Sequence, residues 1–480
     1  MLFNSIAFAI FFPAVTAIFY LLSQRWRVHW LLAASCFFYM AFIPAYILIL
    51  VVTILIDYVA GIYLERVQDP KKKKVLMWVS ILSTCMVLFI FKYFDFFTGS
   101  FVGLAGIFGW HLPRPVISII LPIGLSFHTF QSLSYVVEVY RGRQKAERNF
   151  VVYATYVMFF PQLVAGPIER PQNLLHQFRE WHAFHSTDVT SGLKRMAWGF
   201  FKKLVIADRL ALYVNDVYSA PQNFNGLQVT MATLFFAYQI YCDFSGYSDI
   251  AIGAAQVLGF RLMENFKTPY YSLSISEFWQ RWHISLSTWF RDYVYVPLGG
   301  NRVSKGQHIM NLLLTFSVSG LWHGANWTYV LWGLLNGLYL VTGRLTKDWR
   351  NRFYGSLGLH EHTLTRKAIM LSTTFVLTWM AWIVFRARSI GDAAYVFTHL
   401  ATGWDFQHIA TQQFLLRQLP VAAAAILALE IGQLLNSAVS VPSFVGKMPI
   451  AARWALYASF VMSVLMFGVY KQMQFIYFQF

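Results

Sequence analysis

The stretch MNLLLTFSVSGLWHGANWTYVLWGLLNGLYL, residues 310–340, decides the fold, because a single histidine lies there between two apolar runs. The runs cover residues 310–318 and 328–340 and have the composition of membrane-embedded helices. Glycines on both sides of the histidine allow a local break in the helix or a close approach of another backbone. An ionisable side chain in such surroundings is costly, so His323 is a functional candidate by default.

The overall composition agrees with a membrane protein. Of the 480 residues, 57% are hydrophobic and only 12% are charged, and the mean hydropathy is +0.50. Average soluble domains carry roughly 25% charged residues, so this chain cannot cover a surface that faces water. The net charge of +17 comes from short Lys and Arg clusters between apolar runs, which indicates orientation signals and argues against nucleic-acid binding. The three cysteines lie in apolar segments without metal-ligand spacing, so no metal site is expected.

A series of apolar segments predicts membrane spans, since a helical span needs about 20 mostly apolar residues. The segments are 2–22, 30–43, 45–64, 75–91, 116–139, 151–165, 196–213, 229–258, 309–319, 329–345, 369–385, 414–435 and 454–470. Segment 30–43 ends at Pro44, which is typical of a hairpin or a broken helix. Segment 2–22 has no basic start and no small-residue cleavage site, which predicts a retained first span. Basic clusters near residues 25, 71, 141 and 344 predict cytoplasmic loops and an N-terminus that faces outward.

Two stretches are too polar to be plain spans. Residues 166–195 contain prolines and several histidines, which predicts a cytoplasmic loop with short surface helices. Residues 267–300 mix charged and aromatic side chains, and such backbone persists at membrane depth only where protein or a water-filled cavity surrounds it. We therefore expect a re-entrant, cavity-lining region there. With no repeat and no domain-sized linker, residues 1–480 are predicted to form one membrane domain.

Two histidines are candidates for chemistry. Near neutral pH, an imidazole can take a proton from a hydroxyl group and return it, which His323 would do as a general base. A neutral His323 that hydrogen-bonds a neighbouring helix accounts for the residue equally well. His283 is a candidate for orienting an acyl carbonyl, and helical spacing places Ser287 one turn further on the same face. For His283, a structural hydrogen bond is the simpler interpretation.

Four further polar residues are candidates for lining a substrate route. Asp243 and Tyr247 share a helix face at i and i+4, and they either line a polar tunnel or, as we favour, tie helices together. Arg281 and Arg291 either hold the phosphates of a nucleotide-bearing donor or anchor the chain at the membrane interface. Phosphate-loop, nucleophile-elbow and zinc-protease motifs are absent from the sequence, which disfavours an ATP-driven pump, a serine hydrolase of that type and a zinc protease.

Several runs resemble the membrane-bound O-acyltransferase family, and within it the bacterial alginate O-acetylation type. They are LPIGLSFHTFQSLSYVVEVYRG (121–142), FPQLVAGPIERP (160–171), DFSGYSDIAIG (243–253), RLMENFKTPYYSLSISEFWQRWHISLSTWFRDYVYVPLGGNR (261–302), GLWHGANWTYVLWG (320–333) and QFIYFQF (474–480). The resemblance covers most of the chain and is specific. It implies an all-α polytopic fold, with a ring of roughly 11–13 transmembrane and re-entrant helices around a central tunnel.

The same resemblance implies roles for particular residues. The WHG motif of the family carries its proposed catalytic histidine, which corresponds to His323, and the RWH motif carries a second functional histidine, which corresponds to His283. The donor route is expected between residues 279–291 and 322–326, so that Trp279, Trp322 and Asn326 join the candidate binding residues. Acyl-CoA is the usual donor in this family, and no permanently bound cofactor is implied.

The expected function is therefore transfer of an acetyl group from cytoplasmic acetyl-CoA to, or towards, an extracytoplasmic polysaccharide of the alginate type. The resemblance favours a route through a periplasmic acetyltransferase partner, and it implies a protein that contacts membrane lipid in the bacterial inner membrane. Alternatives within the same chemistry are acyl transfer to peptidoglycan, cellulose or teichoic acid. An alternative of another class is a proton-coupled transporter or a polysaccharide-export component.

Overall fold

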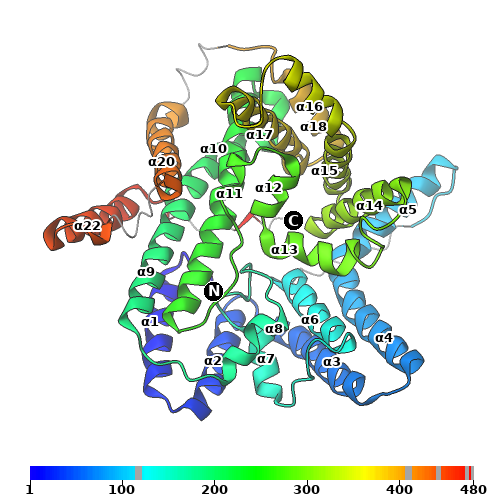
Figure 1. Cartoon of the computed structure of the whole chain (residues 1–480), viewed down its shortest axis with the longest axis vertical. Coiled ribbons are helices and arrows are strands. Elements are labelled where there is room, and N and C mark those ends of the chain that lie inside the picture. The colour runs from blue at the N-terminus through cyan, green and yellow to red at the C-terminus, as the bar shows by residue number, and fades with distance from the viewer. Residues whose placement is uncertain (114–121, 406–412, 439–444, 471–474, 477–480) are drawn as a thin grey trace.

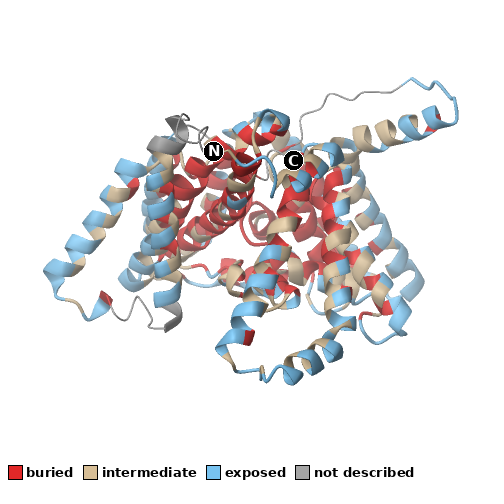
Figure 2. Ribbon diagram, turned by 90° about the horizontal axis from the view of Figure 1, so that it is seen from above, coloured by how far each residue is buried: buried red, intermediate tan, exposed pale blue. Residues whose placement is uncertain are grey.

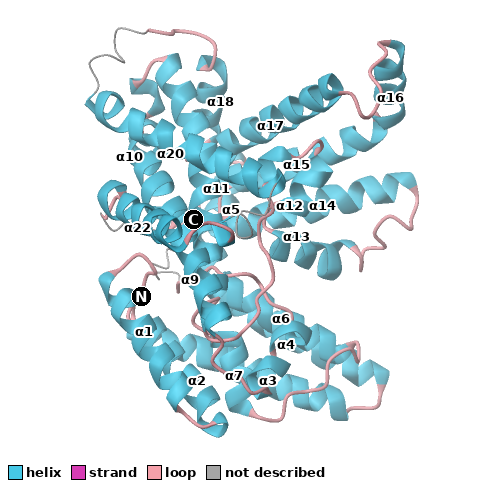
Figure 3. Ribbon diagram, turned by 60° about the vertical axis from the view of Figure 1, so that its left-hand side comes forward, coloured by secondary structure: helices cyan, strands magenta, loops and turns pink. Residues whose placement is uncertain are grey.

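Helices form every regular element of the protein, in a computed structural model that describes residues 1–113, 122–405, 413–438, 445–470 and 475–476. Figure 3 shows helices joined by loops, and no strand occurs within these ranges. The prediction of an all-α fold is therefore confirmed. The first residues of the predicted span 116–139, together with residues 474 and 477–480 of the closing run, lie outside the described residues.

Five helical stretches of the described chain are long and apolar enough to cross a membrane. They are Pro44–Arg66, Pro70–Ile107, Leu364–Arg386, Gln418–Leu435 and Ile450–Phe467. Figure 2 shows buried residues gathered at the centre of the molecule and exposed residues along its outer helices. Water would make so much exposed apolar surface unfavourable, whereas lipid covers it, so the chain is a multi-pass membrane protein.

The N-terminal helices form one side of the molecule (Figure 1). They are α1 (Ile6–Leu21), α2 (Gln24–Met40), α3 (Ile47–Arg66), α4 (Pro70–Leu88), α5 (Phe94–Ile107), α6 (Leu125–Tyr140) and α7 (Phe150–Met158), with a short turn η1 (Pro44–Tyr46) before α3 and a π turn η2 (Phe89–Tyr93) between α4 and α5. Asp57 of α3 ties two of these helices together, because its carboxylate accepts hydrogen bonds from the α4 hydroxyls of Ser80 and Thr84 at 2.8 and 3.1 Å.

The long helix α11 (Gly226–Val257) lies at the centre and is buried along most of its length. It packs against a continuous helical stretch made of α9 (Ser186–Phe200), the π turn η4 (Phe201–Ala207) and α10 (Asp208–Ser219). Glycines let α9 and α11 approach closely: a Cβ atom on Gly199 would lie 2.6 Å from the carbonyl oxygen of Gly246. Lys203 reinforces the contact by pairing with Asp208 at 2.8 Å and with Asp243 at 2.5 Å.

The polar stretch 267–300, for which the sequence predicts a re-entrant region, is divided into short helices. These are η6 (Pro269–Tyr271), α12 (Ile275–Arg281), α13 (Ile284–Phe290) and the π turn η7 (Arg291–Tyr295). The chain then forms a hairpin of α14 (Lys305–His323) and α15 (Trp327–Leu345), whose turn is 324–326. The described part of the chain continues with α16 (Lys347–Ser356), α17 (Leu364–Arg386), α18 (Ile390–His399), α20 (Gln413–Ala438) and α22 (Ile450–Phe467).

Some sequence-based boundaries are wrong. The predicted span 151–165 is only the nine-residue helix α7, because Pro161 disfavours helical backbone at the residue before it. The break predicted at Pro44 is present, since α2 ends at Met40 and η1 separates it from α3. The polar segment 166–195 does contain the short helices α8 (Pro171–Leu174) and η3 (His176–Arg179), but it is not purely a surface loop, since Leu174 and Phe178 are buried and α9 already begins at Ser186.

Candidate active site

His323 is the last residue of α14, and its ring has a defined hydrogen bond. The Nδ1 atom lies 2.7 Å from the carbonyl oxygen of Ser319, one turn earlier in the same helix. A carbonyl oxygen can only accept, so Nδ1 carries the proton and Nε2 carries the lone pair. The helix stops here because Gly324 adopts an extended conformation. The imidazole is thereby held in the tautomer that a general base needs.

Aromatic rings enclose the His323 imidazole. The ring centroids of Trp322 and Trp332 each lie 4.9 Å from it, and that of Phe385 lies 5.6 Å from it. The residue is only 3% exposed. These rings come from α14, α15 and α17, so three helices that are separate along the chain build one apolar enclosure. Polar interactions gain strength where water is excluded in this way.

His283 occupies the break between α12 and α13. Its backbone is left-handed, with φ 43° and ψ 55°, a conformation that costs a residue other than glycine about 1–3 kcal/mol. The neighbouring backbone holds it there: the Ile284 amide donates to the carbonyl oxygen of Asn265, and the Ser287 amide donates to the carbonyl oxygen of His283, both at 2.9 Å. Backbone strain that persists under such bonds is typical of functional positions.

Trp322 brings the two histidines into one site. Its ring centroid lies 6.3 Å from the His283 ring, while the same indole contacts His323. Phe130 of α6 stacks on this indole at 5.0 Å, and Phe244 of α11 contacts His283 edge-on at 4.4 Å. The structure therefore assembles both predicted histidines in one aromatic site.

Three other predicted residues lie near this site. Trp279 contacts the site through Trp332, since the centroids of the two indole rings lie 5.7 Å apart and Trp332 contacts His323. Asn326 caps α15, where its side-chain oxygen accepts from the Thr328 amide at 3.0 Å. Ser287 follows His283 by one turn, as the spacing predicts, but its hydroxyl donates to the carbonyl oxygen of Trp282 at 3.1 Å.

Asp243 and Tyr247 lie on the same helix, α11, as predicted, and both are buried. The Asp243 carboxylate pairs with Lys203 and also accepts from the backbone amide of Ile476 at 2.8 Å. The Tyr247 ring stacks on Phe3 with centroids 4.5 Å apart. These contacts agree with the interpretation that we favour from the sequence, in which both residues tie distant parts of the chain together.

The two predicted arginines each have an acidic partner. Arg281 pairs with Glu277 at 2.6 Å, and Arg291 pairs with Asp292 at 2.8 Å. Arg291 is exposed and Arg281 is partly exposed. Phosphate binding by either guanidinium would compete with these carboxylates, so the structure adds no support for that role.

Sequence reasoning missed Lys92, whose ammonium group contacts the end of α14. The signal was available, because Lys92 is a charged side chain inside an apolar helix. The aromatic walls contributed by Phe127, Phe130, Phe244 and Phe385 were also missed. Phe127 and Phe130 are neighbours at i and i+3 on α6, but no spacing rule relates them to Phe244 of α11 or Phe385 of α17.

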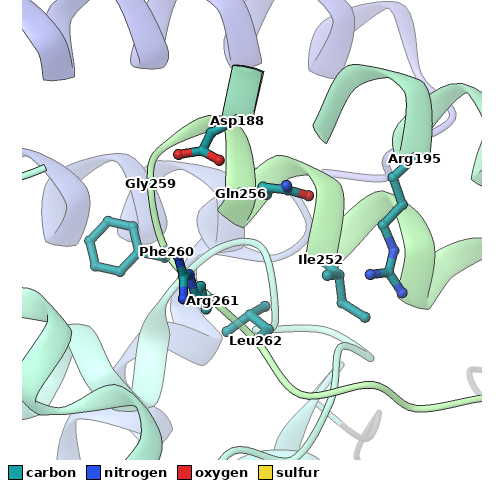
Figure 4. A pocket seen from close by; sticks show the side chains of 8 residues that line it. All are labelled: Asp188, Arg195, Ile252, Gln256, Gly259, Phe260, Arg261 and Leu262. Atoms are coloured by element: carbon teal, nitrogen blue, oxygen red, sulfur yellow. The ribbon is translucent and has the colours of Figure 1, made fainter. Parts of the chain in front are cut away.

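A pocket of about 340 Å³ opens beside the end of α11, away from the predicted route between residues 279–291 and 322–326. Figure 4 shows its lining, with Asp188 and Arg195 from α9 facing Gln256 and Arg261. Arg195 is engaged by Asp249 and by Glu264. The pocket is mixed in charge and contains neither histidine.

The fold and site define a multi-span membrane protein with two buried histidines among aromatic rings, one of them hydrogen-bonded through Nδ1 to a carbonyl of its own helix. The family model described as MBOAT, membrane-bound O-acyltransferase family, matches residues 81–385, a range that includes both histidines. The chain belongs to the membrane-bound O-acyltransferase family and is an acyltransferase.

Relatives with assigned names fall into three groups. The chain is 38% identical to the probable alginate O-acetylase AlgI of Pseudomonas putida, over 89% of this chain and 85% of the relative. It is 32% identical to the peptidoglycan O-acetyltransferase of Helicobacter pylori, over 82% and 78% of the two chains. The teichoic acid D-alanyltransferase of Bacillus subtilis is 28% identical, over 55% and 68%. The three names describe acyl transfer to alginate, peptidoglycan and teichoic acid.

Proposed function

We propose that this acyltransferase moves an acetyl group from cytoplasmic acetyl-CoA to, or towards, an extracytoplasmic polysaccharide of the alginate type. The observation that carries the proposal is the 2.7 Å hydrogen bond from His323 Nδ1 to the Ser319 carbonyl oxygen, which leaves Nε2 as the basic atom. The names of the alginate relatives support an acetyl group as the transferred group and alginate as the acceptor class.

The transfer requires one base and conserves protons. Nε2 of His323 takes the proton of an acceptor hydroxyl while its oxygen attacks the thioester carbonyl carbon. The new C–O ester bond forms, the C–S bond breaks, and the CoA thiolate leaves. The imidazolium then returns the proton to the thiolate, which restores the base and releases CoA–SH.

His283 and Trp322 would shape the place where this exchange occurs. Both side chains are buried, so a thioester that reaches them has left bulk water, which limits its hydrolysis. The fixed backbone of His283 directs its imidazole into the aromatic enclosure. We therefore assign His283 to orienting the acyl carbonyl or the acceptor, and His323 to proton transfer.

An extracytoplasmic partner protein would complete the reaction. The positive-inside rule predicts that the start of α4 and the end of α15 face the cytoplasm, and His323 lies at the opposite end of the α14–α15 hairpin. In this orientation the base would lie nearer the outer side than the donor entrance does. A carrier group on a periplasmic partner of a bacterial inner-membrane enzyme could collect the acetyl group there. Membership of an acyltransferase family favours this chemistry over the transporter alternative.

Peptidoglycan is the second candidate acceptor, because one relative that is 32% identical carries that name. Acetyl content of the two polymers in a deletion strain separates the candidates. Loss of acetyl groups from an alginate-type polysaccharide supports the proposal, whereas loss from peptidoglycan alone replaces the acceptor that we propose.

The enzymatic proposal is tested with purified protein in liposomes and radiolabelled acetyl-CoA. We expect His323→Ala to lower acetyl transfer and CoA release by about 10²–10⁴-fold, the range for a positioned general base. His362→Gln is the matched control, because His362 is exposed and lies beyond α16. Activity of His323→Ala near that of the wild type would remove this residue from the mechanism.

A further inference from the structure

Lys92 is a charged residue within an apolar helical stretch. It lies in the π turn η2, which joins α4 and α5 into the continuous apolar stretch Pro70–Ile107. Between residues 75 and 107 the only charged residues in the sequence are Lys92 and Asp95. A charged side chain at such a position is costly unless its interactions compensate, and π turns inside helices occur frequently at functional sites.

The Lys92 ammonium group contacts the end of the helix that carries His323. Its Nζ donates to the carbonyl oxygen of Trp322 at 2.7 Å and to that of His323 at 3.3 Å. These are the last two carbonyls of α14, and the last four carbonyls of a helix have no intrahelical N–H partner. A cation is also favoured at a helix C-terminus, where the helix dipole is negative.

The same lysine contacts the Trp322 side chain. Nζ lies 5.8 Å from the centroid of the indole, within the range of a cation–π interaction. That indole is the ring that contacts both histidines. Lys92 therefore acts on the backbone and on the side chain that define the geometry of the site.

Helix α5 holds the other side of the turn that follows His323. The Trp327 indole Nε1 donates to the hydroxyl of Ser100 at 3.2 Å, and its ring lies 5.4 Å from that of Phe96. Lys92 and Ser100, which belong to one continuous helical stretch, thus contact the segment 322–327 at two points. The carbonyl of Ser319, which orients the imidazole, belongs to the same last turn of α14.

We infer that Lys92 is a positioning residue of the acyl-transfer site, whose ammonium group fixes the last turn of α14 and thereby the direction of the His323 imidazole. This role rests on the proposed function of His323. A lysine that anchors a helix places its ammonium group at the lipid surface. The ammonium group of Lys92 instead donates to the backbone carbonyl oxygens of Trp322 and His323.

Kinetics of Lys92→Met in liposomes test the inference. We expect kcat to fall by about 10- to 100-fold, because a displacement of a catalytic group by about 1 Å costs rates of this order. The KM for acetyl-CoA should stay nearly unchanged, since Lys92 is not assigned a contact with the donor. Lys92→Arg should recover most of kcat, because a guanidinium also donates to carbonyl oxygens. Lys74→Met removes an exposed lysine from the same helix and is the control.

Hydrogen–deuterium exchange of the purified protein gives a readout that needs no activity. Lys92→Met should raise exchange in peptides that cover residues 319–327, whereas Lys92→Arg and Lys74→Met should leave it close to the wild type. If Lys92→Met does not fold, Lys92→Gln, which keeps donors without the charge, is measured in the same way. Unchanged exchange together with unchanged kcat would overturn the inference.

The two proposals fail in distinguishable ways. A wild-type protein that transfers no acetyl group contradicts the proposed function, while the exchange experiment still decides whether Lys92 fixes the end of α14. An active wild type, an inactive His323→Ala and a fully active Lys92→Met would contradict only the role of Lys92.

Discussion

The His283 imidazole and the Trp322 indole lie with their ring centroids 6.3 Å apart, although His283 lies within the broken segment 267–300 and Trp322 lies near the end of α14. The same indole is 4.9 Å from His323. One tryptophan therefore fixes the spacing of two histidines. The geometry of the site therefore depends on how the chain enters α13 at His283.

The left-handed backbone of His283 makes a prediction about substitutions. We expect His283→Asn and His283→Val both to lose acyl transfer, because both lack the imidazole. Their stabilities should differ, since Asn tolerates a positive φ whereas a β-branched residue does not. The valine variant should be less stable by about 1–3 kcal/mol, measured as thermal unfolding in detergent.

Thr268→Gly is the control, because Thr268 has the same φ of 43° and no imidazole, and it should raise stability. Equal unfolding of the Asn and Val variants would contradict this account.

The close approach of α9 and α11 predicts an effect of one methyl group. In Gly199→Ala, the new Cβ would lie 2.6 Å from the Gly246 carbonyl oxygen, so the helices must separate. We expect a loss of about 1–3 kcal/mol in the free energy of unfolding, the usual cost of overpacking. Gly343→Ala on α15 meets no atom within 4 Å and should be neutral or stabilising. Thermal denaturation of both variants checks the contrast, and equal melting temperatures would refute it.

The buried carboxyl group of Glu169 predicts that the free energy of unfolding depends on pH. It lies in the loop between α7 and α8, outside the membrane-spanning helices, and burial raises its pKa to about 7 from an ordinary value of 4.5, against opposing contributions from the Met263 amide, Asn173 and Arg170. Because the folded-state pKa is raised, the protonated form favours folding: its contribution is complete below pH 4.5 and is lost as the pH rises through about 7.

Glu169→Gln, which stays neutral, should therefore gain stability relative to the wild type between pH 5 and pH 8. The measurement is the difference between their unfolding temperatures at several pH values. A difference that does not grow with pH would show that Glu169 does not ionise in this range.

Much of the fold was predictable from composition and periodicity. The apolar segments 309–319 and 329–345 predicted spans where α14 and α15 are found, and the polar content of 267–300 distinguished this stretch from the plain spans. Both histidines could be selected because an ionisable group in an apolar run has a physical cost. The same argument would have selected Lys92. The energetic cost of burying a charge identifies the residue, but it does not show which groups the residue contacts.

The remaining features depend on contacts between residues far apart in the chain. Nothing local to Asp243 indicates that its carboxylate receives the backbone amide of Ile476. The length of α7 was overestimated because hydrophobicity continues past the point where Pro161 stops the helix. The left-handed conformation of His283 is also set by distant partners, above all the carbonyl oxygen of Asn265, and no short-range preference of histidine predicts it.

The stretch Pro70–Ile107 contains 38 residues, which at 1.5 Å per residue is about 57 Å of helix, against roughly 30 Å of hydrocarbon in a bilayer. Such a stretch must tilt, bend or emerge from one side of the bilayer, and Figure 1 shows α4 and α5 running in different directions on either side of η2. Because Lys92 lies at this bend and donates to the backbone carbonyl of His323, we expect the thickness of the host bilayer to alter the geometry of the proposed site. Turnover in vesicles of short-chain and long-chain lipid should consequently differ, even when the donor and the acceptor are identical.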